Sequence, residues 1–142
     1  MGKRDYQNDA MEGLAAQLIA GLRRLRKGYV DAGAALVQII DPEAEYPYEF
    51  VVYRLTGYRP RGGGDAEPMS GASVRADLQR MLLDLCDSFE LRTSDYPEAV
   101  YDTRALCRRF SVSSKTIQRW RRRGLPARRL IFPDGRRRNA FL

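Results

Sequence analysis

The sequence contains no histidine and only two cysteines, Cys86 and Cys107. Histidine is the commonest general base near neutral pH and the commonest zinc ligand, so both kinds of site would have to be built without it. Two cysteines far apart in the sequence cannot complete a four-ligand metal site, and we expect both to be reduced thiols that pack in or near the core. The sequence therefore predicts no metal ion, no cofactor and no enzyme activity.

Long apolar runs are also missing. No segment approaches the ~20 apolar residues that span a bilayer, and residues 1–6 lack the basic and apolar regions of a signal peptide. The hydrophobic fraction of 44% and the charged fraction of 30% are ordinary for a folded protein, and 142 residues allow one core or two small units. We expect a cytoplasmic protein without a membrane partner, located at the nucleoid if it binds DNA.

Positive charge is concentrated near the C-terminal end. The segment from Asp102 to Leu142 holds twelve arginines and one lysine against two aspartates, whereas the preceding 101 residues hold 12 basic and 16 acidic side chains. A basic module attached to a mildly acidic body is the charge pattern of a nucleic-acid-binding protein that carries a partner-binding domain. The alternative is a solubilising basic tail, which would not need the apolar patterning described below.

Apolar periodicity predicts a helical body over residues 1–92. A first helix is expected over 9–27, with cations in its last turn and Gly28 at its end. Its apolar stripe consists of Leu14, Leu18, Leu22 and Leu25. A second, shorter helix is expected over 31–40, because Pro42 restricts the residue before it to extended geometry.

The rest of the body contains two further predicted helices on either side of a loop. Residues 46–58 combine strand-forming side chains with a proline near the start and a glycine near the end, and we favour a helix. Residues 59–69 are rich in glycine and proline, lack periodicity and are predicted to be a mobile loop. Ser70 or Ser73 can then cap a helix whose apolar stripe covers 74–89. We expect this body to be a dimerisation or partner-binding module.

The segment 93–142 is predicted to be a winged helix-turn-helix domain. Asp102 or Thr103 can cap a first short helix, which buries Leu106 and Phe110 four residues apart. The whole chain is thus expected to be mainly α, with an N-terminal helical domain followed by a helix-turn-helix and a two-stranded β wing.

A turn over residues 111–113 leads to the second helix of this domain. Ser113 can cap the helix and Gly124 can end it. Ile117 and Trp120, three residues apart, are expected to face inward.

The polar side chains of this second helix are expected to lie opposite its apolar side. Lys115, Gln118, Arg119 and Arg122 recur at spacings of three and four residues. A helix of this width fits the major groove of DNA, where arginine and lysine pair with guanine and glutamine pairs with adenine. The predicted DNA-binding residues of the helix are Ser113, Ser114, Lys115, Thr116, Gln118, Arg119, Arg122 and Arg123. The alternative is a basic face that only contacts solvent.

A second basic segment follows this helix. Pro133, Asp134 and Gly135 lie between two extended runs and predict a tight turn, because proline presets φ and glycine accepts the left-handed position. The expected wing would place its arginines along a phosphate backbone or in a minor groove. The predicted DNA-binding residues of this segment are Arg128, Arg136, Arg137 and Arg138. The alternative is a charged tail that only solubilises the chain.

The run TRALCRRFSVSSKTIQRWRRRGLP, followed by RRLIFPDGRRR, resembles the winged helix-turn-helix of excisionase and MerR-type DNA-binding domains. Residues 112–120 carry most of the likeness, which covers about the last third of the chain. The resemblance implies that Ser113, Thr116 and Arg119 contact DNA and that Ile117 and Trp120 hold the helix in place. The long dimerisation helix that follows the wing in MerR-type regulators has no counterpart here.

A second likeness covers more of the chain. The run IIDPEAEYPYEFVVYRLTGYRP, the helix after it and the ending RNAFL are similar to the N-terminal extension of sigma-70-family factors of planctomycete bacteria. Nothing in the chain resembles the polymerase-binding and promoter-recognising regions of a sigma factor. The likeness implies a fragment or a stand-alone relative of such a factor, with RNA polymerase as a possible partner.

The sequence therefore predicts sequence-specific binding of double-stranded DNA in transcription regulation or initiation. A second copy of the chain or RNA polymerase would bind the helical body. An excisionase-like or phage DNA-packaging factor is an alternative use of the same module. A protein-interaction module that binds an acidic partner is an alternative of another class. An enzyme ranks last, because Ser113 and Ser114 have no neighbouring base and the acidic residues form no convergent set.

Overall fold

The computed structural model describes residues 6–60 and 67–142. Within them the chain is mainly helical, with two small antiparallel sheets. The helices are α1 (Asp9–Ala20), α2 (Arg26–Ile39), α3 (Tyr48–Thr56), α4 (Gly71–Asp87), α5 (Thr103–Phe110) and α6 (Ser114–Arg122). The strands are β1 (Glu45–Tyr46), β2 (Met69–Ser70), β3 (Tyr101–Asp102), β4 (Arg128–Ile131) and β5 (Arg137–Phe141). The predicted mainly helical fold class is confirmed at this level.

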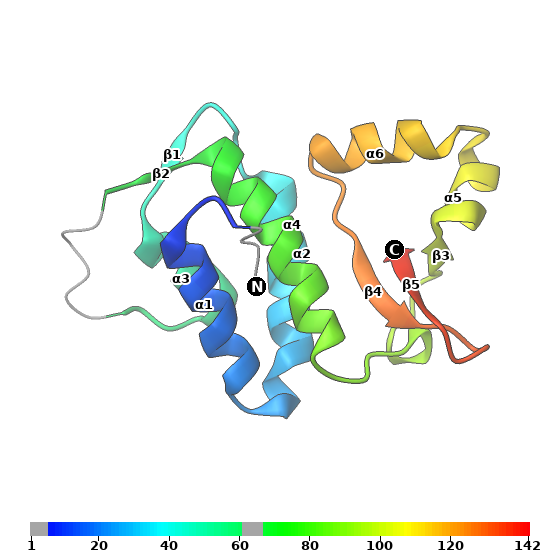
Figure 1. Ribbon diagram of the computed structural model, residues 1–142, viewed down its shortest axis with the longest axis horizontal. Helices are drawn as coiled ribbons and strands as arrows, with labels where there is room; N and C mark the ends of the chain where they lie inside the picture. Colours follow the sequence, from blue (N-terminus) through cyan, green and yellow to red (C-terminus); the bar gives the residue numbers. More distant parts are fainter. Residues whose placement is uncertain (1–5, 61–66) are drawn as a thin grey trace.

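Helix α4 is the central element of the N-terminal half, where it packs against α1 and α2 (Figure 1). Its predicted apolar stripe is buried from Val74 to Leu85, and Leu78 and Leu85 are fully inaccessible, but Phe89 lies beyond the end of the helix and is half-buried. Burying one such side chain contributes about 1.5 to 3 kcal/mol. The predicted cap is also confirmed, since the Ser70 hydroxyl accepts a hydrogen bond from the Ser73 amide at 3.1 Å.

The predicted helix over 9–27 is wrong in its second half. Helix α1 ends at Ala20, a 3-10 turn spans Arg23–Leu25, and α2 then continues through Gly28. Leu22 is 55% exposed and Leu25 41% exposed, so neither belongs to the buried stripe. The Arg26 side chain donates hydrogen bonds to the carbonyls of Ile19 and Ser88 and so fixes the break between the two helices.

Helix α3 confirms the helix that was favoured over 46–58, and Gly57, whose φ is +75°, caps its C-terminal end. The predicted mobile loop over 59–69 is only partly described, because residues 61–66 lie outside the described residues. Its last residue was assigned wrongly, since Met69 is buried and pairs with Tyr46 between β2 and β1. A ladder of two residues is too short to leave a periodic signal in the sequence.

Asp77 is a buried carboxylate that the sequence analysis did not single out. It lies on α4 with no exposed surface and accepts hydrogen bonds from the backbone amides of Gln7 and Asn8, at 2.7 and 2.9 Å. The Asn8 side chain donates to it as well. Because a buried carboxylate is stable only when its oxygens accept hydrogen bonds, this cluster holds the segment before α1 against α4.

The C-terminal half contains a three-stranded antiparallel sheet in the order β3-β5-β4. Strands β4 and β5 form the predicted hairpin, in which Arg128 lies opposite Ala140 and Ile131 opposite Arg137. Gly135 adopts a φ of +83° in its turn, as the sequence predicted. Strand β3 was not predicted, because its two residues lie within a segment without periodicity.

The two halves of the chain share a core. Leu130 of β4 and Ala140 of β5 are fully buried and belong to the same apolar cluster as the α4 stripe. The Ile131 amide donates to the Leu91 carbonyl at 2.8 Å across the predicted boundary between residues 92 and 93. The predicted units 1–92 and 93–142 are therefore packed together and are not joined by a bare linker.

Candidate nucleic-acid interface

Helices α5 and α6 are joined by a tight turn whose geometry is set by local hydrogen bonds. The Asp102 carboxylate caps α5 by accepting from the Ala105 amide at 2.8 Å, and the Ser113 hydroxyl caps α6 by accepting from the Thr116 amide at 3.3 Å. Ser111 takes a left-handed φ of +56°, which reverses the chain between the helices. Both helix starts lie where the sequence predicted them.

A small second core holds α6 against α5 and the sheet. Leu106 and Ile117 are buried in it as predicted, together with Ala127 and Phe141, and Trp120 is half-buried at its edge. The predicted burial of Phe110 is wrong, because this side chain is 53% exposed and lies edge-on to Trp120 at 5.8 Å between ring centroids. Helix α5 ends at Phe110, and the Phe141 ring from β5 fills the interior of this core instead.

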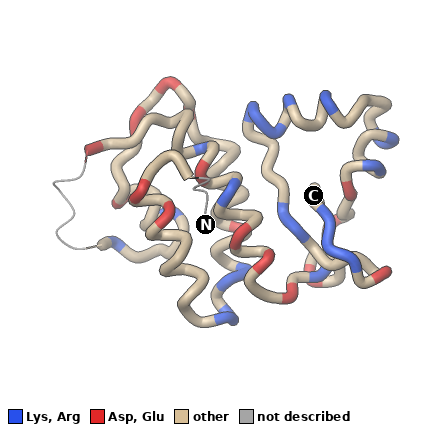
Figure 2. The backbone as a smooth tube through the Cα atoms, in the orientation of Figure 1, with Lys and Arg blue, Asp and Glu red and all other residues tan. Residues whose placement is uncertain are grey.

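The outward face of α6 carries the predicted polar set. Lys115, Gln118, Arg119 and Arg122 are all exposed, on the side of the helix opposite Ile117. Ser113, Ser114 and Arg123 are also exposed, whereas Thr116 is half-buried and accepts a long hydrogen bond from Arg119 at 3.5 Å. Figure 2 shows basic positions along α6 with no acidic position among them. No acidic residue occurs between Asp102 and Asp134, so the charges that α6 contributes to this face are all positive.

The C-terminal end of α6 is held by side chains of α4, which the sequence analysis missed. Arg75 donates to the Arg122 carbonyl at 2.7 Å, and Gln79 donates to the carbonyls of Arg121 and Leu125, each at 2.9 Å. The Arg122 carbonyl lies in the last turn, where a helix leaves carbonyls without intrahelical partners, and the other two carbonyls gain a side-chain donor. The orientation of α6 is therefore fixed by the helical body as well as by its own small core.

Two of the predicted wing arginines, Arg136 and Arg138, lie beside the hairpin turn, the first exposed and the second half-buried. Arg136 is exposed beside the turn, and Arg138 forms an ion pair with Asp134 while its guanidinium lies 5.1 Å from the Phe132 ring centroid. The Arg136 amide, which donates to Asp134, and the Arg138 side chain together hold the pKa of Asp134 below its usual value. The turn therefore keeps its negative charge while it positions two arginines.

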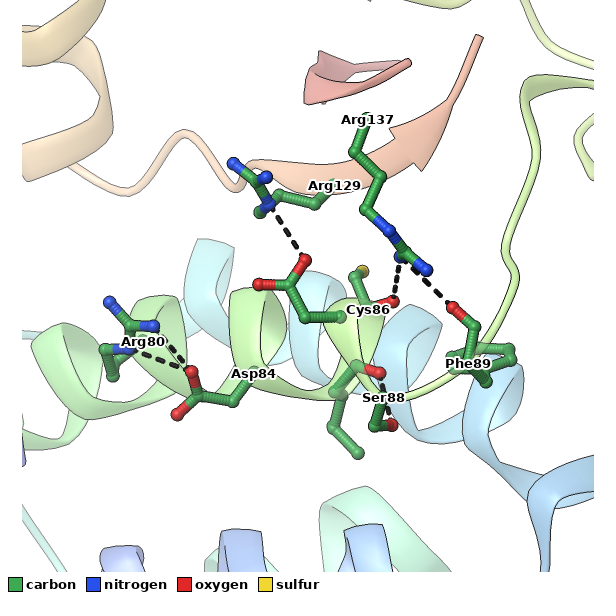
Figure 3. Close-up of polar contacts among 9 residues, drawn as sticks. Arg80, Asp84, Cys86, Ser88, Phe89, Arg129 and Arg137 are labelled. Atoms are coloured by element: carbon green, nitrogen blue, oxygen red, sulfur yellow. Dashed lines mark hydrogen bonds and ion pairs between the residues drawn. The ribbon is translucent and has the colours of Figure 1, made fainter. Parts of the chain in front are cut away.

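The other two predicted wing arginines are turned toward the body. The Arg128 side chain is 10% exposed, pairs with Asp31 at 3.0 Å and donates to the Tyr96 hydroxyl at 3.1 Å. Arg137 donates to the carbonyls of Cys86 and Phe89 at 2.8 and 3.1 Å (Figure 3). Both side chains hold the sheet on the body, so Arg128 and Arg137 are not part of the candidate interface, contrary to the prediction.

Two neighbouring arginines are expected to differ in their contribution to stability, because Arg137 forms hydrogen bonds to the body and Arg136 is exposed. Arg137→Ala is expected to lower the free energy of unfolding by about 1 to 2 kcal/mol, because the end of α4 loses a charged donor. Arg136→Ala, which removes an exposed side chain, is expected to change it by less than ~0.5 kcal/mol. Urea denaturation followed by circular dichroism measures both, and equal losses in the two variants would contradict the assignment.

Reactive side chains elsewhere on α4 are either buried or ion-paired. Cys86 is buried, and burial raises the pKa of its thiol to about 11, so the thiol stays protonated near neutral pH. Asp84 pairs with Arg80 and Asp87 pairs with Arg129 on the surface of α4 (Figure 3). Within residues 6–60 and 67–142, no three metal-ligating side chains gather, and no helix has the length and apolar character needed to cross a membrane.

Comparisons with protein-family models, with curated proteins and with solved structures found no match to this chain. What the protein does is therefore inferred from its own residues.

Proposed function

We propose that the chain binds double-stranded DNA in a sequence-specific way, with α5 and α6 as a helix-turn-helix and α6 in the major groove. The observation that carries the proposal is the exposed face of Lys115, Gln118, Arg119 and Arg122 on a helix whose opposite side is buried through Ile117. An α-helix with its side chains is about 10 to 12 Å across, and the major groove is about 12 Å wide. The likeness of residues 112–120 to excisionase and MerR-type domains supports the same arrangement.

The residues of α6 have distinct proposed roles. Arg119 and Lys115 pair with guanine and Gln118 pairs with adenine, since these side chains match the acceptors and donors that those bases present in the major groove. Ser113 and Ser114 lie at the helix N-terminus, where the first amides and the helix dipole favour a phosphate. Thr116, Arg122 and Arg123 add contacts to the sugar-phosphate backbone.

The hairpin β4–β5 is the proposed wing, and Arg136 and Arg138 place its positive charge on the backbone. Such contacts add affinity that depends little on sequence and strongly on salt. One recognition helix and one wing cover less surface than tight specific binding needs. We propose that a second copy of the chain or RNA polymerase binds the helical body and supplies the remainder, in transcription regulation or initiation.

The test is a selection from a pool of random-sequence duplexes at two salt concentrations, followed by sequencing of the bound fraction. Enrichment of a short motif, with affinity that falls as salt rises, is the expected result, and a palindromic motif would indicate a dimer. Salt-sensitive binding without enrichment would contradict base recognition. A failure to bind any duplex would overturn the proposal in favour of an acidic protein partner.

Arg119→Ala is expected to weaken binding to the selected motif by ~1 to 3 kcal/mol and to relax the preference at one base position. Arg24→Ala is the matched control, because it removes one exposed arginine from the turn between α1 and α2. Fluorescence anisotropy with the motif and with a scrambled duplex measures the two affinities. A loss that is equal on both duplexes would show that Arg119 contacts only the backbone.

A further inference from the structure

A groove of about 470 Å³ separates α4 from α6. Its α4 wall includes Ala72 and Ala76, which lie one helical turn apart and are exposed. Their side chains end at Cβ, so they leave room between the helices. Gln118 and Arg122 of α6 belong both to the groove and to the exposed face described above. The groove therefore runs directly beside the proposed recognition surface.

The charge of the groove is positive. Arg75 from α4 and Arg121 and Arg122 from α6 line it, and no acidic side chain is among its lining residues. The Nε of Arg121 is a buried donor and has no hydrogen-bond partner within the described residues. Burial lowers the pKa of Arg121, as expected for a cation held away from water without a counter-charge. An anion in the groove would compensate this desolvation.

We propose that the groove between α4 and α6 holds the sugar-phosphate backbone of the DNA strand that flanks the major groove occupied by α6. The inference rests on the proposed function. Because the helix nearly fills the width of the major groove, a row of phosphates must pass close along each side of it. On the side of Gln118 and Arg122, the neighbouring element is α4. The helical body is then part of the DNA interface and not only a partner module.

The contacts of Arg75 fit this arrangement. It donates to the carbonyls of Arg122 and Arg123, at 2.7 and 3.4 Å, and so holds its positive charge at the wall of the groove. These bonds also set the distance between α4 and the end of α6. A phosphate backbone is the favoured occupant over an acidic peptide, because the groove is continuous with the face that the proposal places against base edges.

The test changes the charge of the groove without touching the hydrogen bonds of Arg75. Ala72→Lys and Ala72→Glu are compared with Ala16→Lys and Ala16→Glu, which make the same charge changes at an exposed position of α1. Affinity for the selected duplex, or for a random duplex if no motif is enriched, is measured over a series of salt concentrations. Arg119→Ala is measured beside them as a probe of the recognition helix itself.

We expect DNA affinity to depend on the sign of the charge introduced at residue 72 and not on the sign of the charge introduced at residue 16. Ala72→Lys should steepen the dependence of log affinity on log salt by ~0.9, the value for one added phosphate contact. Ala72→Glu should weaken binding about tenfold, through repulsion of a nearby phosphate at low salt. Residue 72 is the second of α4, where the helix dipole favours glutamate and disfavours lysine. Melting curves should therefore change in the opposite direction to DNA affinity, which separates binding from stability.

Three outcomes would overturn the inference. If the Ala72 and Ala16 variants behave alike while Arg119→Ala loses affinity, the backbone does not pass through the groove and the proposed function stands. If the unaltered protein binds no duplex, the proposed function fails and this inference fails with it. If polyglutamate binds more tightly than duplex DNA and Ala72→Glu weakens that binding, the groove is a site for an acidic protein segment.

Discussion

Replacing Gly71 by alanine is expected to lower the free energy of unfolding by roughly 3 kcal/mol or more, at the upper end of what overpacking costs. A Cβ at this position would lie 1.9 Å from the carbonyl oxygen of Asp41 and 3.1 Å from that of Ala44. The Gly71 amide donates to the Ala44 carbonyl at 2.7 Å, and the Ala44 amide donates to Asp41. The clashing atoms are backbone atoms tied into this turn, so no rotation of a side chain can relieve the overlap.

Gly13→Ala is the matched control for this substitution. Gly13 lies in α1, and no atom comes within 4 Å of the position that its Cβ would take. Alanine in a helix interior is about 0.8 to 1 kcal/mol more favourable than glycine, so this variant should be more stable than the parent. Urea denaturation followed by circular dichroism measures both. A Gly71→Ala variant as stable as the parent would mean that the turn over 41–44 does not press against the start of α4.

Gly71 shows where sequence reasoning stops. The caps and stripe of α4 were predicted because each depends on residues three or four apart in the sequence. The close approach of Asp41 depends on a segment thirty residues earlier, and nothing in residues 70–73 indicates it. Gly28 was predicted wrongly for another reason. It was taken as the end of a helix, although α2 continues through it. The interactions that fix the break are hydrogen bonds of Arg26 to Ile19, near the end of α1, and to Ser88, 62 residues later at the end of α4.

The candidate site likewise combines features that local sequence predicts with features that depend on distant residues. The caps by Asp102 and Ser113 and the polar face of α6 follow from local spacing, and the sequence predicted them. The roles of Arg75 and Gln79 depend on residues more than forty positions later in the chain. In the hairpin, the sequence located the arginines but could not tell which of them would be turned toward the body. That choice is made by Asp31 and by the end of α4, which bind Arg128 and Arg137.

Asp31→Asn is expected to produce a large loss of stability, because it removes the counter-charge of a buried arginine. The Asp31 carboxylate accepts hydrogen bonds from Lys27, from the Tyr96 hydroxyl at 2.6 Å and from Arg128 at 3.0 Å. Breaking a fully buried pair costs about 3 to 5 kcal/mol, and we expect about 2 kcal/mol here because the Asp31 side chain is 34% exposed. Arg128→Met should cost less, because Asp31 keeps Lys27 and contact with water.

The pH dependence of stability separates this electrostatic loss from a packing defect. Burial alone would raise the pKa of Asp31, but hydrogen bonds from Lys27, Tyr96 and Arg128 outweigh it and lower the pKa. A carboxyl whose pKa is lowered by folding contributes stability that is complete above its unfolded pKa of about 3.9 and is lost as pH falls through the folded value. The parent should therefore lose its advantage over Asp31→Asn as the pH falls below about 4.

Urea denaturation of the parent, Asp31→Asn and Arg128→Met between pH 3 and pH 7 measures this difference. A gap between the parent and Asp31→Asn that stays constant over the whole range would mean that the substitution disturbs packing and that the carboxylate charge contributes nothing. A gap that closes in acid would instead show that the carboxylate charge of Asp31 stabilises the fold, and the Arg128→Met variant measures the share that depends on the ion pair with Arg128.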